Sequence, residues 1–334
     1  MSVQAKIDYE KMIQEDVLKV TQGKSFLHNA AAYHTGFLDE KFNKLESYPG
    51  KLSRPILALK FCECFGGKVS QVLPVATAIQ IFHNFTLVHD DIEDNDSLRR
   101  GRPTVWSLWG VNQGINVGDF MYNLAIKSLT RVHKDNLTNV LDVLTEAFER
   151  VVEGQGMDLG FAEKSIKEIS VNDYLKMIEG KSASLIEVSC SIGAYMAGEK
   201  RDEVKLASGY GLNLGLAYQV YDDYMGLWGN EAETGKKTAS DIYEKKKSYP
   251  LLYAYERANS DDKMTLDSIY FKQKITKEDA TKVLDIFERY DAREGVIGLI
   301  SKYKEKTVLC LEKMDISSSW QVEFKSMINK LVKI

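Results

Sequence analysis

An apolar stretch that ends abruptly in aspartates constrains this chain more than any other feature. Residues 82–89 are apolar enough for a buried helix, and Asp90, Asp91 and Asp94 follow. Because each helical residue advances about 100°, Asp90 and Asp94 lie about 40° apart on one face, with Asp91 to the side. Carboxylates on one face repel each other, and a divalent cation relieves that repulsion. Hard oxygen ligands with room for water suit Mg²⁺, which in such sites usually binds phosphate as well.

The same arrangement returns in the second half of the chain. Residues 218–229 are again an apolar run that carries paired aspartates, Asp222 and Asp223. A solvated acidic helix end is the competing interpretation of one such motif taken alone. The second copy favours the functional interpretation. We expect the two helix ends to face each other and to hold Mg²⁺ ions and a diphosphate between them.

Composition restricts the fold class and the partners. The chain has 334 residues, 44% hydrophobic and 28% charged, with only 5 prolines. Strand-like alternation is rare, so we predict an all-α protein. The net charge of −4 argues against nucleic-acid binding. The four cysteines form no metal or redox spacing, which is typical of reduced thiols in a cytoplasmic protein.

The chain order predicts one domain, 1–334, because no linker or change of composition interrupts it. No signal core precedes it, and no run looks long and apolar enough to span a bilayer, so no membrane anchor is expected. Residues 97–104 are expected to form a loop. The sequence pattern predicts helices at 3–22, 25–46, 71–95, 112–131, 137–163, 172–198 and 202–228, another opening at Pro55, and short amphipathic helices over 251–334.

Several cationic residues, considered one at a time, could be ordinary surface residues without a role in binding. Lys51 and Arg54 are close enough in sequence to clamp a phosphate, although such a turn is more often a charged surface turn. Lys181 stands among small residues in an apolar helix, where a snorkelling or surface lysine is the ordinary interpretation. Lys246 lies in a charge run that would by itself be a solvated loop.

Taken together and in this order, the motifs match a family. They are Gly50-Lys51-x-x-Arg54-Pro55, the first aspartate motif with Arg99 and Arg100, Gly154-Gln155-x-x-Asp158-Leu159, the Lys181 segment and the second aspartate motif. The sequence resembles the trans-isoprenyl diphosphate synthases, that is, the polyprenyl synthetase family with its farnesyl and geranylgeranyl diphosphate synthases. The resemblance extends from the first of these motifs to Pro250. It implies an isoprenoid synthase helical bundle, with a central cavity between the two aspartate-rich helices, and usually a homodimer.

The resemblance also implies a role for each matching residue. About three Mg²⁺ ions would be held by the aspartate motifs, Asp90, Asp91, Asp94, Asp222 and Asp223. The allylic diphosphate would contact Arg99, Lys181, Ser182, Gln219, Lys236 and Lys246. The isopentenyl diphosphate pocket would consist of Lys51, Arg54, His83 and Arg100, and Gln155 and Asp158 would support the metal site. The residues expected to carry catalysis are Asp90, Asp94, Arg99, Lys181, Asp222 and Lys246.

The implied enzyme is a Mg²⁺-dependent prenyltransferase that joins isopentenyl diphosphate to dimethylallyl, geranyl or farnesyl diphosphate. Mg²⁺ and cationic side chains would neutralise the departing pyrophosphate, so that the carbon–oxygen bond ionises. The double bond of isopentenyl diphosphate would attack the allylic cation, and the released pyrophosphate would accept the proton. The site must exclude water, which would quench the cation.

Four positions bear on the subfamily and on the product. Many members carry a third aspartate in the second motif where this chain has Gly226, a variant that resembles geranylgeranyl-type synthases. Phe85 and Thr86 stand five and four residues before Asp90, with Phe82 three residues further upstream. In this family, bulky residues there close the product tunnel. Phe85 as its floor predicts geranylgeranyl diphosphate; Phe82 as its floor predicts farnesyl diphosphate.

Two other classes compete with a synthase that acts alone. A class I terpene cyclase also uses an aspartate-rich helix, but its second metal site has a different pattern, and it would need no isopentenyl diphosphate pocket. A regulatory subunit of a heteromeric synthase commonly loses the aspartate motifs, and this chain keeps both.

Overall fold

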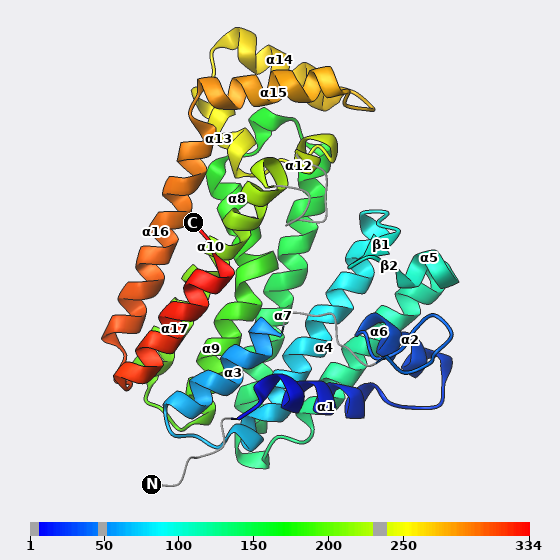
Figure 1. Cartoon of the computed structure of the whole chain (residues 1–334), viewed down its shortest axis with the longest axis vertical. Helices are drawn as coiled ribbons and strands as arrows, with labels where there is room; N and C mark the ends of the chain where they lie inside the picture. The colour runs from blue at the N-terminus through cyan, green and yellow to red at the C-terminus, as the bar shows by residue number, and fades with distance from the viewer. Residues whose placement is uncertain (1–6, 46–51, 230–238) are drawn as a thin grey trace. The chain divides into compact units, whose positions relative to one another are not determined.

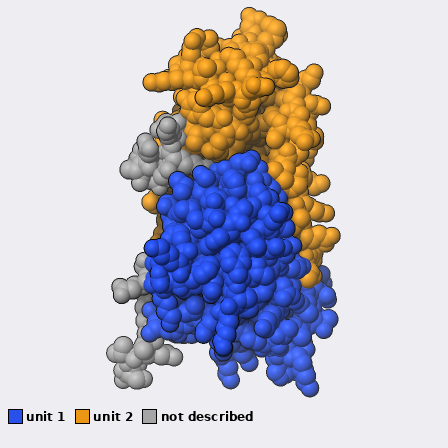
Figure 2. Space-filling view, turned by 90° about the vertical axis from the view of Figure 1, so that its right-hand side faces the viewer, with its two compact units in different colours: residues 1–144, 189–204 blue, residues 145–188, 205–334 orange. Residues whose placement is uncertain are grey.

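The computed structural model describes residues 7–45, 52–229 and 239–334, and these are almost entirely helical (Figure 1). The predicted all-α class is confirmed. The chain forms two compact units, which are coloured separately in Figure 2. The number of domains stays a prediction, as does the cavity between the two aspartate-rich helices.

The first unit contains Met1–Leu144 and Ser189–Val204. Its central helix α4 packs against helices on several sides, α6 and α3 foremost, because almost its whole circumference is apolar. Val72, Ile79 and Phe82 of α4 are fully buried. The elements are α1 (Tyr9–Thr21), α2 (Phe26–His34), α3 (Ser53–Cys64), α4 (Val69–Glu93), β1 (Leu98–Arg99), β2 (Arg102–Pro103), α5 (Val105–Trp109) and α6 (Val111–Leu129); α7 (Lys134–Glu163) begins in this unit and α9 (Ser184–Met196) ends in it.

One expectation about α4 was wrong. By length and composition, this helix could cross a membrane, with a mean hydropathy of 1.2 over its most apolar window. However, 61% of that window is buried inside the structure. Apolarity all round a helix is also what a protein core requires, and the burial identifies α4 as a core helix.

The second unit contains Thr145–Val188 and Lys205–Ile334. In it, α13 packs on α16, and α16 packs on α15 and α17. Besides the rest of α7, its elements are η1 (Ile166–Glu168), α8 (Val171–Ile178), η2 (Glu179–Ala183), the start of α9, α10 (Arg201–Trp228) from Lys205 onward, α12 (Ser240–Tyr243), α13 (Tyr249–Arg257), α14 (Ser260–Phe271), α15 (Lys277–Arg289), α16 (Ala292–Lys313) and α17 (Ser318–Leu331).

Three local predictions differ from the structure. The helix expected over 25–46 ends at His34, because Gly36 takes a φ of 90° and the chain then turns back through a Leu38–Lys44 bridge. The loop expected over 97–104 contains a two-stranded hairpin. The helix expected over 172–198 is divided by a π-helical turn, η2.

Candidate active site

The first aspartate motif occupies the last turn of α4 and the residues directly after it. Asp94 caps the helix and donates its backbone N–H to the Asp90 carbonyl at 2.8 Å. Asn95 then adopts a φ of 56°, which ends the helix. Asp90 is partly exposed and Asp94 exposed. The motif therefore presents Asp90 and Asp94 at a helix end that solvent can reach.

Asp91 has a different environment, because its side chain is only 1% exposed. Its Oδ1 accepts a hydrogen bond from the Arg99 Nε at 2.6 Å, whereas Oδ2 is buried without a hydrogen-bond partner among the described residues. Burial raises the pKa of Asp91 to about 6, against the opposing effect of the Arg99 charge. The pair ties the hairpin to α4 and places Arg99 beside the motif. Metal ligation by Asp91 stays a prediction.

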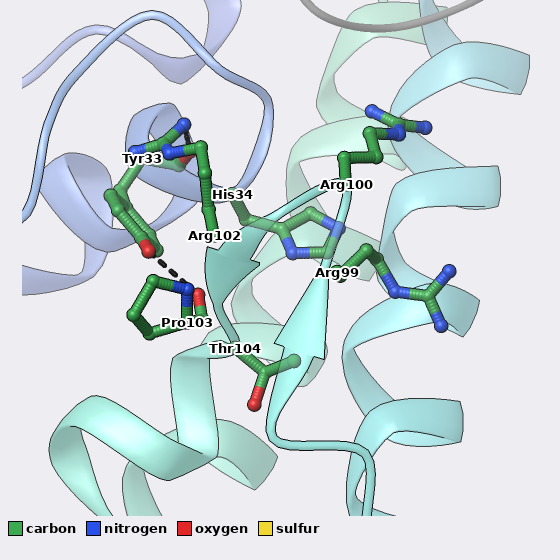
Figure 3. A pocket seen from close by; sticks show the side chains of 7 residues that line it. All are labelled: Tyr33, His34, Arg99, Arg100, Arg102, Pro103 and Thr104. Atoms are coloured by element: carbon green, nitrogen blue, oxygen red, sulfur yellow. Dashed lines mark hydrogen bonds between the residues drawn. The ribbon is translucent and has the colours of Figure 1, made fainter. Parts of the chain in front are cut away.

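The hairpin gathers three arginines around a small pocket in the first unit (Figure 3). Its turn is made by Arg100 and Gly101, both with positive φ. Arg102 Nη2 donates to the Leu38 carbonyl at 2.7 Å, and its guanidinium lies 4.2 Å from the Tyr33 ring centre. The lining is Tyr33, His34, Arg99, Arg100, Arg102, Pro103 and Thr104. Such a cationic concave surface suits an anion.

Of these lining residues, sequence reasoning assigned only Arg99 and Arg100 to the site. Tyr33 donates its hydroxyl to the Pro103 carbonyl at 2.6 Å, drawn as a dashed line in Figure 3. The Arg-Gly-Arg run could have pointed to Arg102, since it continues the predicted basic turn. Nothing local in the sequence distinguished Tyr33 or His34 from ordinary helix residues.

The structure brings together two residues of the predicted isopentenyl diphosphate pocket. Arg54 Nη1 lies 3.1 Å from His83 Nε2. Burial, followed by the Arg54 and Arg100 charges, holds the pKa of His83 well below its usual range. His83 is therefore a neutral imidazole beside cations. Lys51, the fourth predicted member, lies outside the described residues.

His34 shares this cationic environment. The pKa of His34 is lowered to about 3. Burial is the main cause, and the charges of Arg99, Arg100 and Arg102 contribute less. Its ring forms a hydrogen bond with the backbone of Asn84, while Nε2 is buried without a hydrogen-bond partner among the described residues. His34 is therefore a neutral imidazole that lines the arginine pocket.

In the second unit, the two aspartates of the second motif differ in burial, as those of the first motif do. Asp222 is exposed, whereas Asp223 is buried. Asp223 accepts hydrogen bonds from the Tyr174 hydroxyl at 2.6 Å and from Gln219 Nε2 at 2.9 Å. Burial, with the nearby Asp241 charge, raises the pKa of Asp223 to about 7. Tyr174 was not anticipated, because a tyrosine in an amphipathic helix looks like ordinary core.

Two predicted allylic-diphosphate contacts join this network. Ser182 donates its hydroxyl to Gln219 Oε1 at 2.6 Å. Through Gln219, the π-helical turn η2 is thereby connected to Asp223 of α10. The structure therefore connects Ser182 and Gln219, which were assigned to the allylic diphosphate, with Asp223, which was assigned to the metal.

Lys181 sits in η2 and pairs with Asp158 of α7 at 2.5 Å. This pairing depends on a close approach of the two backbones: a Cβ on Gly154 would clash with the backbone of Gly180 and Lys181. Gln155 lies on the same helix, one turn before Asp158. Because π-helical turns interrupt the regular ladder, they often redirect side chains at functional sites.

Lys246 lies between two carboxylates, 3.1 Å from Glu244 and 3.6 Å from Asp241. Burial acts to lower the pKa of Lys246, but Asp241 and Glu244 outweigh it and hold that pKa well above its usual value. The group stays cationic under all ordinary conditions. Lys236, the other predicted cation of this part of the chain, lies outside the described residues.

The chain-length residues form an aromatic cluster in the first unit. The rings of Phe82 and Phe85 are 5.1 Å apart, and Tyr122 of α6 lies 5.8 Å and 5.5 Å from them. Phe82 is fully buried, whereas Phe85 is only partly buried. Thr86 donates its hydroxyl to the His83 carbonyl at 2.9 Å. Tyr122 is a further residue that sequence reasoning missed.

The donor set of the two motifs fits Mg²⁺ in kind. Asp90 and Asp94 at the end of α4, and Asp222 within α10, offer hard carboxylate oxygens that solvent reaches, which leaves coordination positions for water and phosphate. Asp91 Oδ2, which is buried and has no hydrogen-bond partner within the described residues, adds a donor beside Asp90 and Asp94. Within the described parts of the chain, no three His, Cys, Asp or Glu side chains are already gathered closely enough to hold an ion.

Comparison with known proteins gives the family. Residues 36–287 match the family model "Polyprenyl synthetase". The chain is 33% identical over 285 residues to geranylgeranyl diphosphate synthase of Saccharolobus solfataricus, covering 84% of this chain and 85% of that relative. It is 35% identical to (2E,6E)-farnesyl diphosphate synthase of Mycobacterium bovis, over 69% of this chain and 63% of that protein.

Solved structures agree with this assignment. The crystal structure of geranylgeranyl pyrophosphate synthetase from Pyrococcus horikoshii superposes with a TM-score of 0.88 at 29% identity, covering 97% of this chain and 96% of that one. A family model that matches most of the chain, a relative aligned over most of both lengths and a shared fold all lead to the same assignment. The chain belongs to the polyprenyl synthetase family, the trans-isoprenyl diphosphate synthases.

Proposed function

We propose that this prenyltransferase condenses isopentenyl diphosphate with an allylic diphosphate and releases geranylgeranyl diphosphate. The observation that carries the proposal is the juxtaposition at the end of α4. There, the partly exposed Asp90 and the exposed Asp94 stand on either side of the buried Asp91, which holds Arg99 in place. Oxygen donors for a divalent cation beside a fixed guanidinium suit a diphosphate group.

Mg²⁺ held by Asp90, Asp94 and Asp222 would supply positive charge to the leaving diphosphate, and about three ions are expected by family resemblance. Arg99, Lys181 and Lys246 would bind the allylic diphosphate and neutralise the charge that develops on it. Lys246 suits this role, because its carboxylate neighbours keep it protonated. Asp91 and Asp223, from inside the motifs, would hold Arg99 and Gln219 in position.

The Arg54–His83 pair and Arg100 would bind isopentenyl diphosphate. A neutral His83 can offer a ring N–H to a phosphate oxygen while Arg54 supplies the charge. Lys51 and Lys236 remain assigned to the two diphosphates by resemblance. Gln155 and Asp158 would support the metal site, Asp158 through its ion pair with Lys181.

The geranylgeranyl product is favoured over farnesyl by the relative that aligns over most of both chains. We propose that the Phe82–Phe85–Tyr122 cluster closes the product tunnel, with Phe85 as the replaceable floor. Phe85→Ala should then lengthen the product, as measured by chromatography of the dephosphorylated alcohols. Leu87→Ala, a change at a partly buried neighbour on α4, is the control. An unchanged product from Phe85→Ala would remove Phe85 from the floor and leave Phe82.

A homodimer in the cytoplasm is part of this proposal. Several apolar side chains of α6 and α7 are exposed in the single chain, among them Ile115 and Val152 at 44% and 55%. Contact with a second copy would bury them. Light scattering of the purified chain, at two concentrations, measures the oligomeric state, and a monomer at both would contradict the dimer.

The deciding experiment incubates the purified chain with Mg²⁺, labelled isopentenyl diphosphate and, separately, dimethylallyl, geranyl and farnesyl diphosphates. Geranylgeraniol after dephosphorylation, abolished by a chelator, is the expected result. A stop at farnesol would overturn the product and keep the reaction class. A cyclic hydrocarbon from an allylic substrate alone would indicate a terpene cyclase. No turnover with any starter would indicate a subunit that needs a partner.

A further inference from the structure

The arginine pocket of the first unit contains a buried polar atom that has no hydrogen-bond partner among the described residues, Nε2 of His34. His34 is the last residue of α2, and in Figure 3 its ring lies between Arg102 on one side and Arg99 and Arg100 on the other. Burying a ring nitrogen without a partner is unfavourable. At the wall of a pocket, such an atom points to a ligand that supplies the partner.

The other nitrogen of the ring fixes the tautomer of His34. Because Nε2 has no partner, the hydrogen bond between the ring and the Asn84 backbone is made by Nδ1. This bond raises the pKa of His34, so Nδ1–H donates and the Asn84 carbonyl of α4 accepts. In the neutral ring, Nε2 is therefore an acceptor without a proton, in a pocket lined by three arginines.

The positive charges of this pocket are held in place by the protein. Arg99 is paired with the buried Asp91 at 2.6 Å, and Arg102 donates to the carbonyls of Tyr33 at 3.3 Å and Leu38 at 2.7 Å. The two carbonyls fix Arg102 without neutralising it. Fixed cations beside an acceptor nitrogen suit an anion that can share a proton near neutral pH. A phosphate group can do so, since its second pKa is about 6.

The same pocket adjoins residues proposed for isopentenyl diphosphate. Arg100 lines it, and Arg100 and Arg54 are the charges that most depress the pKa of His83. The charge of His34 is a smaller cause of the same depression, so the two imidazoles lie near each other. His34 from α2 and His83 from α4 therefore border one cationic region.

We propose that His34 is a further substrate-binding residue of the isopentenyl diphosphate pocket, whose Nε2 binds an oxygen of the terminal phosphate through a proton that the complex takes up from solvent. The inference rests on the proposed function and deepens it. In the complex, Nδ1 donates to Asn84 and Nε2 donates to the phosphate, so the ring is an imidazolium. The phosphate charge stabilises that cation against the arginines, and no covalent bond of the substrate changes.

This contact makes binding depend on pH. At pH 7.5 the free ring is neutral, because its pKa is about 3, and the free phosphate has lost its second proton. Binding then takes up about one proton, so the affinity should fall about tenfold from pH 7 to pH 8. Arg99, Arg100 and Arg102, which face His34 from the hairpin, stay charged throughout. His83, from α4, is the described neighbour that could also titrate, so the test compares variants of His34 itself.

Two replacements separate the functions of the two ring nitrogens. His34→Asn keeps an N–H donor near the place of Nδ1, so the bond to Asn84 can persist, but it removes Nε2. His34→Gln gives up Nδ1 and places an amide near Nε2. His133→Asn makes the same chemical change at an exposed histidine and is the control.

Titration calorimetry with isopentenyl diphosphate measures the binding without turnover. It is performed with a chelator present, at pH 7.5, in two buffers of different ionisation enthalpy, which gives both the affinity and the number of protons taken up. The second readout is the KM for isopentenyl diphosphate and, separately, the KM for farnesyl diphosphate in prenyl transfer.

We expect His34→Asn to take up fewer protons than the unchanged chain and to bind isopentenyl diphosphate about tenfold more weakly. Its KM for isopentenyl diphosphate should rise, with the KM for farnesyl diphosphate unchanged. His34→Gln should also take up fewer protons, yet bind more tightly than His34→Asn, because an amide N–H donates without a proton from solvent. His133→Asn should match the unchanged chain.

A purely structural role for His34 would reverse the order of the two variants, since His34→Asn keeps the bond to Asn84 and His34→Gln does not. That reversed order would overturn the inference. So would binding by the unchanged chain without proton uptake, or an uptake that His34→Asn leaves unaltered.

The two readouts also separate this inference from the proposed function. If the unchanged chain transfers no prenyl group, yet binds isopentenyl diphosphate with a proton uptake that His34→Asn loses, the function fails and the role of His34 stands. If the unchanged chain is an active synthase and His34→Asn keeps both the affinity and the proton uptake, the function stands and the role of His34 fails.

Discussion

At the scale of single residues, the aspartates of the two motifs differ in burial. Asp90, Asp94 and Asp222 are at least partly exposed, whereas Asp91 and Asp223 are buried. A buried carboxylate is unfavourable unless hydrogen-bonded or paired, and both are: Asp91 with Arg99, Asp223 with Tyr174 and Gln219. Paired aspartates thus combine one group that faces the solvent with one that fixes neighbouring side chains.

The pair of Asp91 and Arg99 gives a prediction about stability without substrate. Arg99→Gln would leave the buried Asp91 carboxylate without its cation, so the free energy of unfolding should fall by about 2 kcal/mol. Urea denaturation without ligands measures it. Arg100→Gln is the control, because it removes the same charge from an exposed position of the same turn. Equal stability of the two variants would mean that Arg99 serves the substrate alone.

His34 gives a prediction about pH. Its folded-state pKa of about 3 lies below the ordinary value of 6.5, so the unfolded chain binds more protons between these values. The stabilising contribution of a neutral His34 is therefore present above pH 6.5 and decreases as the pH falls below it. His34→Gln should weaken the loss of urea stability between pH 7.5 and 5.5. The exposed His133→Gln should not; equal slopes for His34→Gln and the unchanged chain would contradict the prediction.

At the scale of elements, the π-helical turn η2 decides where Lys181 points. The helical pattern of the sequence gave no sign of it, since a π-turn adds one residue per turn without changing composition. The small residues Gly154 and Gly180 allow α7 and η2 to approach, and Lys181 then reaches Asp158. The glycines are visible in the sequence, but only the packing of α7 against η2 shows that they permit this close approach.

Adding a methyl group at Gly154 tests this arrangement. Gly154→Ala should force α7 away from η2, with a loss of about 1–3 kcal/mol in stability and reduced prenyl transfer. Gly156→Ala, on the same helix, is the control, because no described atom lies within 4 Å of its added Cβ. That change should stabilise slightly, since alanine is the better helix former. Equal effects of the two changes would show that the close approach is not required.

At the scale of the whole molecule, the residues assigned to the site come from both compact units. The first contains Asp90, Arg54 and His83, and the second contains Asp222 and Lys246. Each unit has its own buried core, including Ile79 in the first and Phe287 in the second. Folding should therefore depend on apolar burial, and the metal should be needed only for substrate.

Chelation tests this separation of folding from activity. A chelator should abolish prenyl transfer and leave the Tm unchanged, because carboxylates at helix ends contribute no core. Circular dichroism melts with and without the chelator measure the Tm, and the labelled-substrate assay measures prenyl transfer. Excess Mg²⁺ should restore turnover. A Tm lower by several degrees in the chelator would mean that a cation is part of the fold.

Residue patterns were enough to predict the helical class and the two aspartate helices, and the order of the motifs indicated the family by resemblance. The helical class and the aspartate helices were predictable because apolar periodicity sets which face of a helix is buried and where the polar groups emerge. That spacing did not predict the helix end after His34, where a residue with positive φ follows. It also did not predict the π-turn at Lys181. The expectation that no helix resembled a membrane span also failed, because apolarity alone does not distinguish a core helix from a spanning one.

Which polar groups meet depends on how the helices pack. Arg54 joins His83, Tyr174 joins Asp223, and the carboxylate of Asp241 occupies the place beside Gly226. The partners in each case are at least 15 residues apart in the chain. Burying a charge or a hydroxyl requires a partner, and packing alone determines which one arrives. The sequence therefore predicted the kinds of residues in the site, while the fold determined which of them form pairs.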